Sequence, residues 1–237
     1  MPQGPTAVRP AATVVVLRPR SADDPHPELY MLRRSSKSAF MPDALVFPGG
    51  RVETEDGEGT EGAELDASYA RAARRECLEE ASLDVDTARL RWFDTWLTPS
   101  GESPRRFLAR FFVTTIAPDE GHDAQADGAE THAGRWATAP EILAQWQAEQ
   151  VDLPPPTLSI LMQLADGSWR SWAEREPGWA RAPLLPKIVP AGSTLQIVMP
   201  HDPEYAALPG EAGEVPERAH LYPRRFIREG KRWVPQS

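Results

Sequence analysis

The 237-residue chain is short of cysteine, histidine and long apolar runs, and each shortage excludes something. Its single cysteine, Cys77, excludes an intramolecular disulfide framework and a cysteine-cluster zinc site, and the five histidines show no metal-ligand spacing. No apolar stretch approaches the roughly 20 residues of a membrane-spanning helix, and the run 11–17 is too short for a signal peptide. We therefore expect a reducing, cytoplasmic setting and no membrane partner.

Basic residues are also few: 26 against 35 acidic ones, for a formal net charge of −9. This balance argues against general nucleic-acid binding, which needs a basic footprint. One long stretch has no Lys or Arg at all, between Arg51 and Arg71. It contains seven acids: Glu53, Glu55, Asp56, Glu58, Glu61, Glu64 and Asp66. Such a run is typical of a solvated loop, and we expect 53–66 to lie outside the core.

The residue pattern predicts strands first, then a helix, then strands, then helices. Strands are expected at 12–17, 28–33, 44–47, 90–97, 106–116 and 194–199, and helices at 67–82, 140–150 and 157–165. This order suits an α+β domain with α/β/α layers around a mixed sheet. We expect a tail at 1–11, the domain at 12–165, and at 166–237 a C-terminal extension packed on that domain.

The segment Arg75-Glu76-Cys77-Leu78-Glu79-Glu80 has an unusual concentration of acids. On a helix, Glu76, Glu79 and Glu80 share one face, and their mutual repulsion calls for a cation. Mg²⁺ and Mn²⁺ prefer carboxylate oxygens, so this face is a candidate metal site; the alternative is an ordinary solvated helix face. Arg75 points about 100° away from Glu76. It can fold back onto a carboxylate or pair with the preceding loop, and both options stay open.

A tight turn precedes this helix at Phe47-Pro48-Gly49-Gly50. Two glycines allow backbone conformations that other residues avoid, and they expose backbone carbonyls. Such a turn can supply one oxygen ligand to the metal that the helix carboxylates would hold.

The turn and the acidic helix together resemble the Nudix hydrolase signature. That signature runs Gly, five residues, Glu, seven residues, then Arg-Glu-U-x-Glu-Glu-x-Gly-U, where U is bulky and apolar. Gly50 matches its first position, 75–80 its charged core and Leu83 its last position. There are departures: Ser82 replaces the second Gly, and Cys77 occupies the first U. The signature places its Arg at position 64 (50 + 14), so Arg75 comes 11 residues late (75 − 64). The candidates for the intermediate acid are Glu64 and Asp66.

This insertion resembles the coenzyme A diphosphatases within the family, whose signatures are interrupted. Arg33-Arg34 ahead of the Gly-Gly turn, and Arg106-Phe107 after Thr98-Pro99, agree with that subgroup. The resemblance implies the Nudix fold and hydrolysis of a diphosphate in a small nucleoside diphosphate derivative. It favours coenzyme A or an acyl-CoA, with ADP-ribose, NADH or a non-catalytic nucleotide-binding module as alternatives. It leaves the oligomeric state open, a homodimer included.

The resemblance also assigns roles. It implies Mg²⁺ or Mn²⁺ held by Glu76, Glu79, Glu80 and the Gly49 carbonyl, with Arg75 in the catalytic centre. A further ligand or base is expected from a later loop, where Glu130 is the candidate and Asp127 and His132 compete with it. The arginines proposed to bind substrate phosphates are Arg33, Arg34, Arg51 and Arg106. Three aromatic residues could stack on a base, although strand aromatics are usually core: Trp92, Phe93 and Trp96.

Overall fold

A mixed sheet is built around β1 (Val8–Arg18), a long β-branched strand near the N-terminus. The computed structural model describes residues 7–36, 41–59, 61–100, 106–121, 124–126, 131–167, 169–174 and 180–236. Within them the sheet also contains β2 (Glu28–Arg34), β3 (Leu45–Val46), β4 (Gly49–Arg51), β5 (Arg91–Leu97), β6 (Arg106–Thr115) and β7 (Thr131–Thr138). The strand order is β3-β2-β1-β6-β5, with β4 also paired to β1 and β7 to β2. The β1–β6 pair is parallel and the other pairs are antiparallel, so the sheet is mixed as expected.

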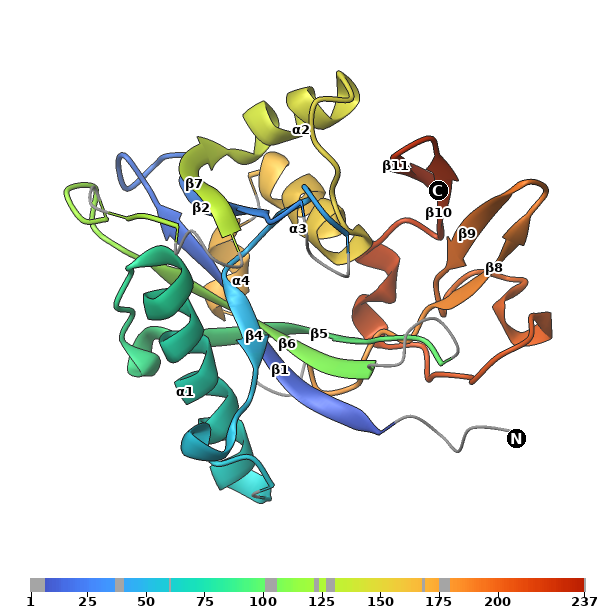
Figure 1. The fold of residues 1–237 in the computed structure, drawn as a ribbon, viewed down its shortest axis with the longest axis horizontal. Coiled ribbons are helices and arrows are strands. Elements are labelled where there is room, and N and C mark those ends of the chain that lie inside the picture. Colours follow the sequence, from blue (N-terminus) through green and yellow to red (C-terminus); the bar gives the residue numbers. More distant parts are fainter. Residues whose placement is uncertain are drawn as a thin grey trace.

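Helices cover both faces of this sheet (Figure 1). Successive strand side chains point to opposite faces, and the two apolar clusters follow this alternation. Val14 and Val16 of β1 pack with α1 (Gly62–Ala81). Val15 and Leu17 belong to the other cluster, with α2 (Ala139–Gln147) and α3 (Pro155–Ala165). The expected α/β/α layering is confirmed.

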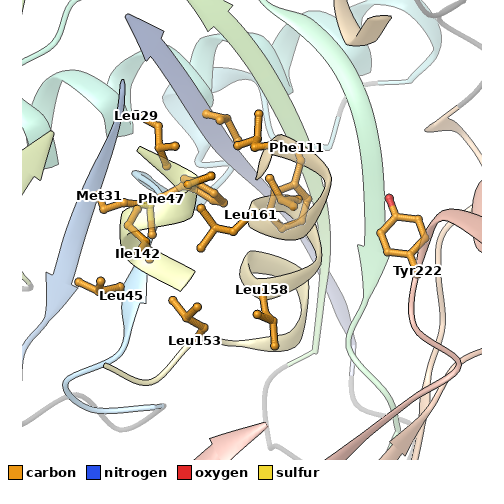
Figure 2. Packing of buried hydrophobic residues seen from close by; sticks show 14 of the residues in the cluster. Leu29, Met31, Leu45, Phe47, Phe111, Ile142, Leu153, Leu158, Leu161 and Tyr222 are labelled. Carbon is orange, nitrogen blue, oxygen red and sulfur yellow. The ribbon is translucent and has the colours of Figure 1, made fainter. Parts of the chain in front are cut away.

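The cluster on the α2–α3 face is the larger of the two. Figure 2 shows sheet residues meeting helix residues there: Leu29, Met31 and Phe111 against Ile142, Leu158 and Leu161. All but Phe111 of these six have no exposed surface, and at roughly 1.5–3 kcal/mol for each buried side chain this layer contributes heavily to stability. The pictured packing includes Tyr222, which comes from far along the chain.

The C-terminal region forms a second sheet, at the right of Figure 1. After α4 (Trp169–Glu174) it contains β8 (Lys187–Ala191), β9 (Thr194–Val198), β10 (Arg225–Glu229) and β11 (Arg232–Gln236), all antiparallel. Only β9 was expected, so three strands were missed. The region contacts β5 directly: Leu97 N–H donates to the Leu184 carbonyl, and Leu184 N–H to the Thr95 carbonyl, both at 2.9 Å.

Several boundaries differ from the expectation. β1 begins at Val8 and pairs with β6 from that residue onward, so 8–11 are strand rather than tail. The strands β4 and β7 were missed. α1 begins at Gly62, so the last five residues of the acidic stretch are helical and the expected loop is wrong there. No helix in the described part of the chain is long and apolar enough to cross a membrane.

Candidate active site

The acidic face of α1 meets the Gly-Gly turn at β4. Gly49 and Gly50 pair with Thr13 and Ala12 of β1, which places them beneath the helix. Gly49 N–H donates to Glu80 Oε2 at 2.8 Å. A Cβ added to Gly50 would lie 2.3 Å from Glu76 Oε1, so only glycine lets that carboxylate approach the backbone. The two segments that the signature separates are thus in contact.

Arg75 is the hub of this contact. Its Nη1 donates to Glu76 Oε1 at 2.9 Å and to Glu79 Oε2 at 3.0 Å. Its Nη2 donates to Asp56 Oδ2 at 2.8 Å and to the Arg51 carbonyl at 2.9 Å. Both options left open by the sequence are therefore realised at once. Burial alone would lower the pKa of Arg75, but the hydrogen bond with Asp56 and the charge of Glu76 outweigh it and raise that pKa.

Asp56 is the site residue that sequence reasoning missed. It is 3% exposed, although the acidic stretch around it was expected outside the core. It lies six positions after Gly50, where the signature has its intermediate Glu, and residues 57–74 take the place of the signature's next seven. The acids considered instead pair elsewhere, Glu64 with Arg71 and Asp66 with Arg110. The spacing from Gly50 was the available signal, but the whole acidic stretch was expected to lie in solvent.

The donor set fits a hard divalent cation. Three carboxylates face the turn from one side of α1, and Glu79 is 58% exposed at its edge. Carboxylate and backbone oxygens are the ligands that Mg²⁺ and Mn²⁺ prefer. Within the described residues no three acidic, His or Cys side chains are already gathered closely enough to hold an ion. Glu76 and Glu80 are instead held by Arg75 and Gly49, so binding would require these carboxylates to turn.

The four arginines proposed for phosphate binding are not equivalent. Arg33 and Arg34 lie half-buried at the end of β2. Arg33 pairs with Leu45 of β3, and β3 comes just before the Gly-Gly turn in the sequence. Arg51 is exposed beside the site, and its Nη2 donates to Glu53 Oε1 at 3.1 Å. These three remain predictions.

Arg106 is placed elsewhere. Arg106 pairs with Val8 on one side of β1, and Gly50 pairs with Ala12 on the other side. Four residues along the strand and two strand spacings therefore separate Arg106 from Gly50 by about 15 Å. Its Nε donates to the Thr98 carbonyl at 2.9 Å and its Nη2 to Glu211 Oε2 at 2.6 Å. The structure therefore places Arg106 apart from the acidic face of α1 and the Gly-Gly turn.

The remaining candidates divide in two. Glu130 and Asp127 lie outside the described residues, as does the side chain of His132. The strand aromatics are engaged in packing: Arg110 lies over Trp92, Phe93 stacks on Trp172, and Trp96 meets Tyr222 edge to face.

Cys77 is fully buried in the α1 cluster. Burial raises the pKa of its thiol to about 12, which makes it a core residue and not a nucleophile.

The family model of the NUDIX domain matches residues 7–155, more than half of the chain. The chain belongs to the Nudix hydrolase family. Nudix hydrolases generally use divalent metal ions, which agrees with the donor set.

Solved structures share the Nudix fold. The crystal structure of a NUDIX hydrolase from Alicyclobacillus acidocaldarius superposes with a TM-score of 0.59 at 23% identity. The match covers 72% of this chain and 97% of that one, which shows a common fold.

Two relatives match by sequence. A Caenorhabditis elegans protein whose name places it among the nudix hydrolases is 27% identical over 171 residues, 57% of this chain and 55% of its own. The acyl-coenzyme A diphosphatase NUDT19 of Xenopus laevis is 59% identical over 29 residues, 12% of this chain and 8% of its own. The Nudix chain thus spans about half the length of the first relative and a small part of the second.

Proposed function

We propose that this Nudix protein hydrolyses the diphosphate linkage of a nucleoside diphosphate derivative, with coenzyme A or an acyl-CoA as its preferred substrate. The observation that carries the reaction class is the contact of Glu76 and Glu80 with the Gly49-Gly50 turn, held by Arg75. The short match to an acyl-coenzyme A diphosphatase, over 29 residues, supports the substrate class.

A Mg²⁺ or Mn²⁺ ion held by Glu76, Glu79, Glu80 and the Gly49 carbonyl would neutralise diphosphate oxygens and lower the pKa of the attacking water. Arg75 orients the Glu76 and Glu79 carboxylates through one nitrogen, Nη1. The absence of a side chain at Gly50 keeps Glu76 against the backbone. Glu130 is our proposed acceptor for the proton of the water, in the role of general base.

The substrate assignment depends on phosphate recognition. Coenzyme A has a 3′-phosphate in addition to its diphosphate, and arginine binds such groups through paired hydrogen bonds. Arg33, Arg34 and Arg51 are the proposed contacts. Arg106 is not retained among them because Glu211 and the Thr98 carbonyl already occupy its guanidinium.

The test is a comparison of kcat/KM with Mg²⁺ and with Mn²⁺ for coenzyme A, dephospho-coenzyme A, an acyl-CoA, ADP-ribose and NADH. We expect coenzyme A and the acyl-CoA to lead, each split by water at its diphosphate into 3′-phosphoadenosine phosphate and a phosphopantetheine product. A preference for ADP-ribose or NADH would reject the substrate and keep the reaction. Nucleotide binding without turnover of any substrate would favour the non-catalytic module.

A further inference from the structure

A second set of contacts holds α1 on the other side of β1 from the acidic turn: Arg110 and Gly50 are both opposite Ala12, one on each side of that strand. Arg110 of β6 has a side chain only 8% exposed, and its Nη1 donates to Asp66 Oδ1 at 2.6 Å. Its guanidinium carbon lies 4.0 Å from the ring centroid of Tyr69 and 4.0 Å from that of Trp92. Tyr69 is 2% exposed. A buried cation over two rings with a paired carboxylate is a strong and directional contact.

The position of Tyr69 on α1 connects this contact with the acidic face. At 3.6 residues per turn, Glu76 is rotated from Tyr69 by only about 20° in one sense, and Glu80 by about 20° in the other. All three therefore lie along one stripe of the helix. Any rotation of α1 about its axis that moves Tyr69 also moves both carboxylates.

The acidic face tolerates little such movement. Glu76 lies so close to Gly50 that a single added carbon would clash, and Glu80 accepts a 2.8 Å hydrogen bond from Gly49. A rotation of 20° at the helix surface, about 5 Å from the axis, displaces a side chain by nearly 2 Å. That displacement is comparable with the whole distance between a metal ion and its oxygen ligand.

We infer that Arg110, Tyr69, Trp92 and Asp66 form a clamp that sets the rotation of α1 and thereby positions the metal-binding carboxylates. The inference rests on the proposed metal site, and Arg110 acts as a positioning residue without touching substrate. Asp66 belongs to the inserted stretch, so the insertion contributes to the clamp. Arg181 of the C-terminal region adds a weaker, exposed contact, 3.4 Å from Asp66.

The experiment measures Mn²⁺ affinity by electron paramagnetic resonance of free Mn²⁺, together with unfolding in urea without metal. Arg110→Met and Tyr69→Leu remove the contact and leave an apolar side chain in its place. Tyr69→Phe keeps the ring, and Arg110→Lys keeps the charge and loses the planar group. The matched control is Arg18→Met. Arg18 is similarly buried, pairs with Glu28 and lies 4.0 Å from the Trp136 ring, without touching α1 in any of these contacts.

We expect Arg110→Met and Tyr69→Leu to weaken Mn²⁺ binding about tenfold, as loss of outer-shell support usually does. Arg110→Lys should weaken it about threefold by the same effect, which keeps a measurable variant if Arg110→Met does not fold. Tyr69→Phe and Arg18→Met should leave Mn²⁺ affinity unchanged, although Arg18→Met loses comparable stability in urea.

Equal loss of Mn²⁺ affinity in Arg18→Met and Arg110→Met would overturn the clamp and leave general destabilisation as the cause. So would wild-type affinity in folded Arg110→Lys and Tyr69→Leu, or a wild-type protein that binds no Mn²⁺. If Mn²⁺ affinity depends on Arg110 and Tyr69 as expected but the wild-type protein hydrolyses no diphosphate, only the proposed function would be refuted.

Discussion

Two arginine networks, at Arg75 and at Arg218, show opposite solutions to placing charge inside one protein. Arg75 lies at the turn between α1 and β4, and its carboxylate partners are Asp56, Glu76 and Glu79. Negative charge exceeds positive charge there, and Glu79 is partly in water. The network remains able to accept a cation.

Arg218 instead forms a closed network, and both it and Asp94 have no exposed surface. Arg218 Nε donates to Asp94 Oδ1 at 2.9 Å. The same carboxylate accepts from Thr95 N–H at 2.8 Å, and from the Trp96 indole and the Tyr222 hydroxyl at 2.7 Å each. Arg218 balances the charge of Asp94, and three neutral donors occupy its carboxylate oxygens. This network therefore has no surplus negative charge with which to bind a ligand. The comparison indicates that an excess of acidic side chains, rather than burial or the presence of an ion pair, distinguishes the candidate metal site at Arg75.

The largest expected effect is a loss of stability when the closed network around Arg218 is disrupted. Arg218→Met leaves the Asp94 charge buried without its cation, so we expect a loss of about 3–5 kcal/mol in the free energy of unfolding. Urea unfolding with and without Mg²⁺ measures it, and the loss should be the same in both. A cost below about 1 kcal/mol would show that water reaches Asp94.

Substitutions in the network around Arg75 should lower catalytic activity rather than stability. Glu79→Gln and Glu80→Gln each remove one carboxylate charge from the metal face, so we expect turnover to fall by about 100-fold or more at limiting Mg²⁺. Stability without metal should hold or rise slightly because repulsion along the helix decreases. Steady-state kinetics and thermal unfolding are the measurements; near-normal turnover in both variants contradicts the metal site.

Tyr222→Phe tests the closed network through the pH dependence of the free energy of unfolding. At pH 7 it removes a buried hydrogen bond to Asp94 and should cost about 1–3 kcal/mol. Burial, and then the charge of Asp94, raise the pKa of the Tyr222 phenol well above its usual value near 10. The wild-type protein should therefore lose stability above pH 10, where the unfolded chain ionises and the folded one does not. Urea unfolding should show that the difference in unfolding free energy between wild type and Tyr222→Phe narrows above pH 10. A constant difference from pH 7 to 11 would contradict this prediction.

The smallest effect is expected where α1 ends. Ser82 adopts a left-handed conformation with φ of 55°, and its N–H donates to the Leu78 carbonyl at 3.0 Å. Ser82→Gly should stabilise the protein by up to about 1 kcal/mol because glycine adopts this conformation without strain. Thermal unfolding measures the gain, with the exposed Ser36→Gly, outside any helix, as the control. Any destabilisation by Ser82→Gly would refute this account of the helix end.

Local spacing was enough to predict the acidic face of α1, because helix periodicity alone puts Glu76, Glu79 and Glu80 together. The Gly-Gly turn and the strand at 12–17 were also readable, because each depends on residues that are adjacent in the sequence. Asp56 was readable in principle, six residues after Gly50, but an expectation based on overall polarity placed the entire acidic stretch in solvent. Its burial depends on Arg75, which comes 19 positions later.

Non-local partners could not be read in this way. Arg106 has the sequence context of a phosphate ligand, yet its partner Glu211 is 105 residues away and comes from a region without clear periodicity. The strands β10 and β11 were missed because Pro235 and the irregularly spaced charges at 225, 228, 229 and 232 obscure the period of two.

Local residue order therefore decided the helix with three aligned carboxylates, the glycine turn and the core strands, since each depends on neighbours within a few positions. The tertiary structure decided which charges are free to act. Arg75, Arg106, Arg110 and Arg218 look alike in sequence, and only the chain's folding gives each its partners: acids in excess for Arg75, a single carboxylate among carbonyls or rings for the others. The reason is that the free energy of a buried charge depends on the groups around it in space, which sequence spacing does not specify.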